Sequence, residues 1–68
     1  MEIRDIIAAK LEQKDWSQNH LAYRSGITQA QISRILSGDS ANIRMATLRA
    51  IARALGCRTV DLLPPEDH

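Results

Sequence analysis

The sequence is poor in aromatic residues and in cysteine. Its 68 residues include no Phe, one Trp and one Tyr, so the core has to be built from Ile, Leu and Ala, which favours packed helices over sheets. The single cysteine, Cys57, excludes an internal disulfide and a C-x-x-C zinc cluster. No run of about 18 apolar residues is present, and Glu2 and Asp5 make the start unlike a secretory signal. We therefore expect one small all-α domain over residues 1–68, located in the cytoplasm and independent of membranes.

The sequence also lacks the groupings of residues that support catalysis. It has no Ser-His-Asp grouping, no carboxylates paired at a useful spacing, no glycine-rich phosphate loop and no metal-ligand cluster. Its two histidines, His20 and His68, stand far from each other in the sequence and suggest neither a metal site nor a catalytic base. We therefore expect a protein that is not an enzyme and that needs no cofactor or metal.

Positive charge is concentrated in the middle of the chain. Residues 16–58 contain six Arg and one Asp, for a net charge of +5, although the whole chain carries only +1. Residues 1–15 carry −1 and residues 59–68 carry −3. A basic middle segment between two acidic flanks is the pattern expected of a face that binds a polyanion such as nucleic acid.

Helical spacing and capping residues divide the first half of the chain into three helices. A first helix is expected from about residue 2 to 14, because its apolar residues share one stripe: Ile3, Ile6, Ile7 and Leu11. Ser17 is a good N-cap for a short second helix, which Gly26 ends in a left-handed conformation. Thr28 can cap a third helix, which ends at Ser37 and Gly38 for the same reason.

The second half predicts one more long helix and a short final one. Residues 39–42 (DSAN) form a polar loop. Thr47 is expected to cap a fourth helix, whose inward residues are Leu48, Ile51, Ala52 and Leu55 and which ends at Gly56. Thr59 opens a final short turn that Pro64 and Pro65 stop, followed by an acidic tail at about 64–68. The expected architecture therefore has five helices.

The second and third helices have the spacing of a helix-turn-helix unit, at about residues 17–37. Such a unit needs a small residue where the helices touch, a left-handed turn and apolar anchors. The residues in these positions are Ala22, Gly26, Ile27, Ile32 and Ile35. The five residues together indicate a helix-turn-helix unit more specifically than any one of them does alone.

On these residues the sequence resembles the lambda-repressor-like family, also called the Cro/repressor or XRE type. The resemblance rests on WSQNHLA (16–22), GITQAQISRILSG (26–38), NIRMATLRAIARALG (42–56) and DLL (61–63). It implies a compact five-helix domain that binds double-stranded operator DNA as a homodimer and acts on transcription, mostly as a repressor. A pseudo-palindromic operator is expected, with the third helix in the major groove.

The resemblance also assigns candidate DNA contacts. Gln29 matches the family's Gln at the start of the recognition helix and can bond bidentately to adenine. Arg34 can donate both arms of its fork to guanine, and Ala30 can lie against a thymine methyl group. Candidate contacts to phosphates or flanking positions are Gln18, Thr28, Gln31, Ser33, Asn42 and Arg44. For Arg49 and Arg53 a solvated helix surface is the better interpretation.

A second class of function remains open, in which the chain is an antitoxin-like or other protein-interaction module. Antitoxins share this fold, and the NIRMATL segment resembles some of them. The apolar DLL segment and the tail PPEDH are candidate surfaces for a protein partner, and binding to such a partner is compatible with autoregulation of an operon. For the homodimer, the candidate surface is the fourth and fifth helices and the tail, with Val60 or Leu63 exposed.

Overall fold

Helices are the only regular structure in the part of the chain that is described. The computed structural model describes residues 2–38 and 43–63. It contains α1 (Ile3–Lys14), α2 (Gln18–Ser25), α3 (Gln29–Leu36), α4 (Met45–Leu55) and a 3-10 turn, η1 (Thr59–Leu62). The all-α expectation is confirmed for these residues, but the count of five helices is not, because the fifth element is a single 3-10 turn.

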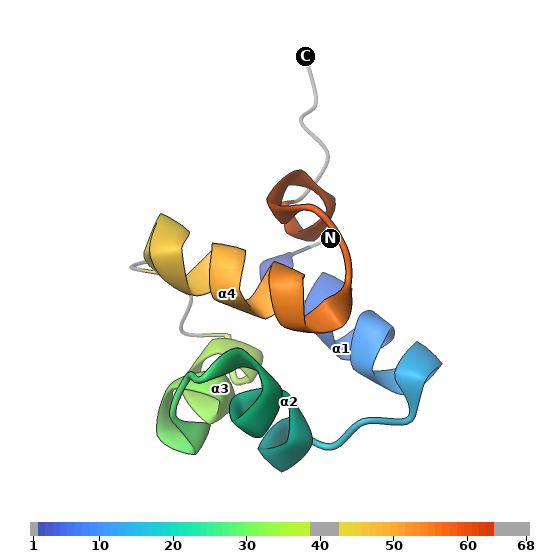
Figure 1. Cartoon of the computed structure of the whole chain (residues 1–68), viewed down its shortest axis with the longest axis vertical. Coiled ribbons are helices and arrows are strands. Elements are labelled where there is room, and N and C mark those ends of the chain that lie inside the picture. The colour runs from blue at the N-terminus through green and yellow to red at the C-terminus, as the bar shows by residue number, and fades with distance from the viewer. Residues whose placement is uncertain (1, 39–42, 64–68) are drawn as a thin grey trace.

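The helices pack so that α2 and α3 lie together beneath α4 (Figure 1). α2 contacts both α3 and α4, while α1 contacts α3 and η1. η1 also packs against α4, on the opposite side of that helix from α2 and α3 (Figure 1). None of the helices in the described residues is long and apolar enough to cross a membrane.

The core is aliphatic throughout, as the shortage of aromatic residues predicts. Every α-helix and η1 contribute to it, and its buried members are Ile7, Leu11, Leu21, Ile32, Ile35, Leu48, Ile51, Ala52, Leu55 and Leu62. No polar side chain is buried among the described residues. The fold therefore depends on close packing of a few branched side chains, each of which contributes roughly 1.5–3 kcal/mol when fully buried.

Four predicted helix ends are confirmed. The hydroxyl oxygens of Ser17 and Thr28 accept hydrogen bonds from the backbone N–H groups of the third residues of α2 and α3, at 3.1 and 3.2 Å. Gly26 and Gly56 end α2 and α4 with φ values of +75° and +76°. Such caps satisfy backbone groups that have no partner inside the helix.

Two predicted helix starts need correction. Thr47 does not cap the fourth helix, because α4 begins at Met45, with Arg44 at the N-cap and Thr47 in the first turn. The side chain of Arg44 makes no capping hydrogen bond. Packing explains the earlier start, since Ile43 and Leu48 both lie against the core in the positions of a hydrophobic staple. α1 begins at Ile3 rather than at Glu2, which is its N-cap.

Some expectations concern residues outside the described ranges. These are the loop 39–42 with Asn42, the stop at Pro64 and Pro65, and the acidic tail 64–68. Of the DLL segment, Leu62 is fully buried in the core. The expectation that the whole segment offers an apolar surface is therefore wrong, and Leu63 is the only one of its two leucines that is exposed.

Candidate DNA interface

The turn between α2 and α3 is held by a short set of hydrogen bonds. The N–H of Gly26 donates to the carbonyl oxygen of Ala22 at 3.0 Å. The Ser25 hydroxyl donates to the same carbonyl at 3.4 Å and accepts from the N–H of Ile27 at 3.2 Å. Ile27 then packs against the core. These contacts fix the direction in which α3 leaves the turn, which is the structural requirement of a helix-turn-helix unit.

α3 has one buried face and one exposed face. Ile32 and Ile35 are buried, and Leu36 packs partly against the core. The other five residues of the helix are exposed: Gln29, Ala30, Gln31, Ser33 and Arg34. The structure thus places all three expected base-contact residues, and two of the expected flanking residues, on the outward side of one helix.

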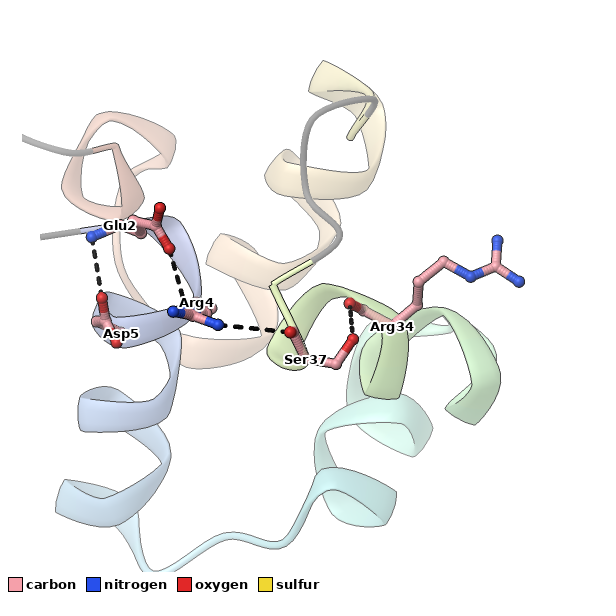
Figure 2. A network of polar contacts seen from close by, with 5 residues as sticks. All are labelled: Glu2, Arg4, Asp5, Arg34 and Ser37. Atoms are coloured by element: carbon pink, nitrogen blue, oxygen red, sulfur yellow. Dashed lines mark hydrogen bonds and ion pairs between the residues drawn. The ribbon is translucent and has the colours of Figure 1, made fainter.

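The side chain of Arg34 is extended and points outward. Figure 2 shows it reaching away from the body of the molecule. No carboxylate pairs with it among the described residues. A guanidinium that is extended and unpaired keeps all its donors available, as bidentate contact with a base requires.

Thr28 is occupied by its own helix. Its hydroxyl oxygen accepts from the N–H of Gln31, and the hydroxyl donates to the Gln31 side-chain oxygen at 3.4 Å. The bond to the Gln31 side chain therefore uses the hydroxyl proton that a phosphate contact would need. In this arrangement the side-chain amide of Gln31 is also held at the start of α3.

The remaining expected contacts come from other elements. Gln18 is exposed and is the first residue of α2, where backbone N–H groups have no helical partner. Arg44 is exposed at the N-cap of α4. Both therefore stand at helix N-termini, which suit anions such as phosphates. Asn42 lies outside the described residues.

The arginines of the middle segment are exposed and almost free of counter-charge. Arg58 pairs with Asp61 at 3.7 Å. Five others form no ion pair with a carboxylate in the described ranges: Arg24, Arg34, Arg44, Arg49 and Arg53. Their positive charge is available to attract a polyanion, as the charge pattern of the sequence predicts.

Arg4 also belongs to this region, although no pattern in the sequence indicates it. Its guanidinium donates to the carbonyl oxygen of Ser37, just beyond α3, at 3.4 Å and pairs with Glu2 at 3.0 Å (Figure 2). The Ser37 hydroxyl in turn donates to the carbonyl oxygen of Arg34 at 2.7 Å. These bonds connect α1 to the end of the helix that carries Arg34. No local spacing pattern joins residues so far apart in sequence.

Trp16 also forms a cluster that its position in the sequence does not reveal. It packs partly against the core, as expected of a residue at a helix entrance. Lys14 and Arg24 lie over its ring, 5.4 and 5.5 Å from the centroid, and His20 meets it edge-on at 4.6 Å. Cation–π contacts of this kind hold the two cationic side chains close to the start of α2.

The helix-turn-helix geometry agrees with comparison to known proteins. The chain matches the Cro/C1-type HTH DNA-binding domain over residues 7–67 and belongs to that family. It is 39% identical over 59 residues to a protein of Bacillus subtilis (strain 168) named "Uncharacterized HTH-type transcriptional regulator YozG". That alignment covers 87% of this chain and 67% of the relative. No significant match was found among solved structures.

Proposed function

We propose that the chain is a sequence-specific transcriptional regulator that represses by binding a pseudo-palindromic operator as a homodimer. The observation that carries this proposal is the outward row of Gln29, Ala30 and Arg34 on α3, the second helix of the helix-turn-helix unit. Family membership supports DNA binding, and the name of the B. subtilis relative supports a role in transcription.

In the proposed complex, α3 lies in the major groove. The amide of Gln29 donates to N7 and accepts from the amino group of an adenine, and Arg34 donates to O6 and N7 of a guanine. Ala30 lies against a thymine methyl group. Gln31 and Ser33 face the flanks of the same groove.

Phosphate contacts would fix the position of α3 on the duplex without reading the sequence. Gln18 and Arg44 are suited to this role because they are exposed at the starts of α2 and α4. Thr28 would join them only by exchanging its bond to the Gln31 side chain for one to a phosphate. Asn42 completes the proposed set.

A homodimer would supply the affinity that one half-site cannot. The proposed surface includes η1 and Leu63, because Val60 is 58% exposed and Leu63 is 37% exposed. An exposed Val60 next to a buried Leu62 presents apolar area that a second copy can cover. The two recognition helices would then meet half-sites about 34–36 Å apart.

The test is selection of bound sequences from a random duplex DNA pool at about 150 mM salt. We expect enrichment of a site with two-fold symmetry, and loss of that enrichment for a Gln29→Ala/Arg34→Ala double variant. An Arg49→Ala variant serves as the control for loss of one exposed charge. Weak, unselective binding with steep salt dependence would contradict the proposal and would favour the protein-interaction alternative.

A further inference from the structure

A hollow lies between the end of α2 and the C-terminal half of α4, outside the row of proposed base contacts. It has a volume of about 370 Å³ and is lined by Arg24, Ser25, Ala50, Arg53 and Ala54. Small-molecule sites commonly have volumes of about 300–1,000 Å³. The hollow therefore has room for a small ligand, although none of its five residues belongs to the DNA contacts proposed above.

The charge of the hollow is entirely positive. Arg24 comes from α2 and Arg53 from α4, and no acidic residue is among the five that line the hollow. Neither arginine forms an ion pair with a carboxylate in residues 2–38 and 43–63. Two positively charged residues line the hollow and no negatively charged one does, so an anion is the occupant that the charge favours.

The other lining groups indicate which donors an anion would find in the hollow. Ala50 and Ala54 are small and leave the space next to the arginines unfilled. The Ser25 hydroxyl donates to Ala22 and accepts from Ile27, so its proton is already used. The arginines are therefore the donors the hollow offers, and their planar forks match the tetrahedral oxygens of phosphate in a bidentate way.

Arg24 is also held in position before any ligand binds. Its guanidinium carbon lies 5.5 Å from the centroid of the Trp16 ring. This cation–π contact restricts a side chain that would otherwise lose considerable conformational freedom on binding. It also connects the hollow to the only Trp of the chain, whose fluorescence can report on changes at Arg24.

We propose that this hollow between α2 and α4 binds a phosphate group through Arg24 and Arg53. The phosphate belongs either to a soluble phosphorylated small molecule or to a DNA backbone. Only the second source rests on the proposed DNA binding. In both cases the bound anion bridges the first helix of the helix-turn-helix unit to α4, and thereby stabilises the contact between them.

The first arm of the test uses the full chain without DNA and pyrophosphate as the probe. We expect saturable binding by calorimetry and by Trp16 fluorescence at matched ionic strength, with a Kd of about 1 mM or tighter. Arg53→Gln should weaken binding about tenfold. Arg49→Gln removes the same charge from the same helix but does not line the hollow, and it should retain most of the binding.

Two results would overturn the proposal. One is the absence of saturable binding to the unsubstituted chain; the other is an equal loss for Arg49→Gln and Arg53→Gln, which would indicate a general effect of net charge. Thermal unfolding by circular dichroism verifies that each variant is folded. Arg53→Lys keeps the charge but not the planar fork. Its affinity for pyrophosphate should be lower than that of the unsubstituted chain and higher than that of Arg53→Gln.

The second arm identifies the source of the phosphate by measuring DNA affinity against salt concentration. If a backbone phosphate occupies the hollow, Arg53→Gln should reduce the salt slope by about one while Arg49→Gln does not. If the ligand is a soluble molecule, the slopes of Arg53→Gln and Arg49→Gln should agree. Because the first arm contains no DNA, failure of the proposed DNA binding leaves the pyrophosphate result interpretable.

Discussion

The side chain of Arg4 donates a hydrogen bond to the backbone carbonyl oxygen of Ser37, so the first turn of α1 touches the end of α3. The guanidinium also lies against Gly38: a Cβ atom built on that residue would come within 2.6 Å of an Arg4 nitrogen. Gly38 has a φ of +106°, where residues with a side chain are strained. A glycine at position 38 therefore avoids two problems that a side chain would cause: strain in the backbone and a clash with the Arg4 guanidinium.

This relationship predicts that Gly38→Ala is more destabilising than Gly26→Ala. Gly26 has a φ of +75° and open space around its Cα, so alanine there should cost about 1 kcal/mol of unfolding free energy for the backbone alone. Gly38→Ala should cost about 2 kcal/mol, mainly because a φ of +106° is less accessible to alanine; the flexible end of the Arg4 side chain can move at a smaller cost. Urea denaturation of the two variants measures the difference.

The contribution of Arg4 can be separated by combining Gly38→Ala with Arg4→Ala. If the contact with Arg4 is part of the cost, the two substitutions should be less damaging together than the sum of their single effects. Strict additivity would show that only the backbone conformation of Gly38 matters.

The expected base contacts predict specific losses of DNA affinity. Gln29→Ala and Arg34→Ala should each weaken binding by about 1–3 kcal/mol at one base position and relax the preference there. Both residues are exposed, so their substitution should leave the unfolding free energy within about 0.5 kcal/mol of its original value. Fluorescence anisotropy with the selected operator and its single-base variants gives the measurement. Binding equal to that of the unsubstituted chain would contradict the assignment.

Capping of the recognition helix predicts a separate effect on stability. Thr28→Ala removes the hydroxyl that accepts from the N–H of Gln31, and it should cost about 0.5–2 kcal/mol of unfolding free energy. Thr28→Ser retains the hydroxyl and should retain most of the stability. Ser17→Ala is the matched change at the start of α2 and should give a loss of similar size. If Thr28→Ser were as destabilising as Thr28→Ala, the hydrogen bond would not be the cause.

Much of the fold could be predicted because its signals are local. Ser17, Thr28, Gly26 and Gly56 each act within a few residues of their own position, through hydrogen bonds or a left-handed φ that the residue type favours. The start of α4 was predicted wrongly because the capping preference of Thr47 is worth only about 1 kcal/mol. Packing of Ile43 and Leu48 against the core outweighs it.

The candidate site shows the same division between local and distant information. The outward placement of Gln29 and Arg34 follows from helical spacing, since Ile32 and Ile35 define the buried face. The contact of Arg4 with Ser37 joins residues 33 positions apart, and the hollow depends on how α2 packs on α4. Periodicity along the chain contains no information about such pairs, so the structure was needed to find them.

The proposed homodimer predicts that Val60 matters for association but not for folding. Val60 is 58% exposed in the single chain, so Val60→Glu should change the unfolding free energy of the monomer by no more than about 0.5 kcal/mol. In a dimer that covers Val60, the same substitution places a charge in an apolar contact and should abolish association. Sedimentation equilibrium over a range of concentrations measures this directly.

Two control variants separate loss of the dimer surface from an effect of net charge and from unfolding of the monomer. Tyr23 is 84% exposed on α2, so Tyr23→Glu introduces the same charge at an exposed residue of another element and should leave association intact. Leu62 is fully buried, so Leu62→Ala should instead unfold the monomer, at a cost of about 2–5 kcal/mol. If Val60→Glu assembled as well as the original chain, the dimer surface would have to lie elsewhere. If Tyr23→Glu were equally defective, the effect would be one of net charge, because the two variants share only their added carboxylate.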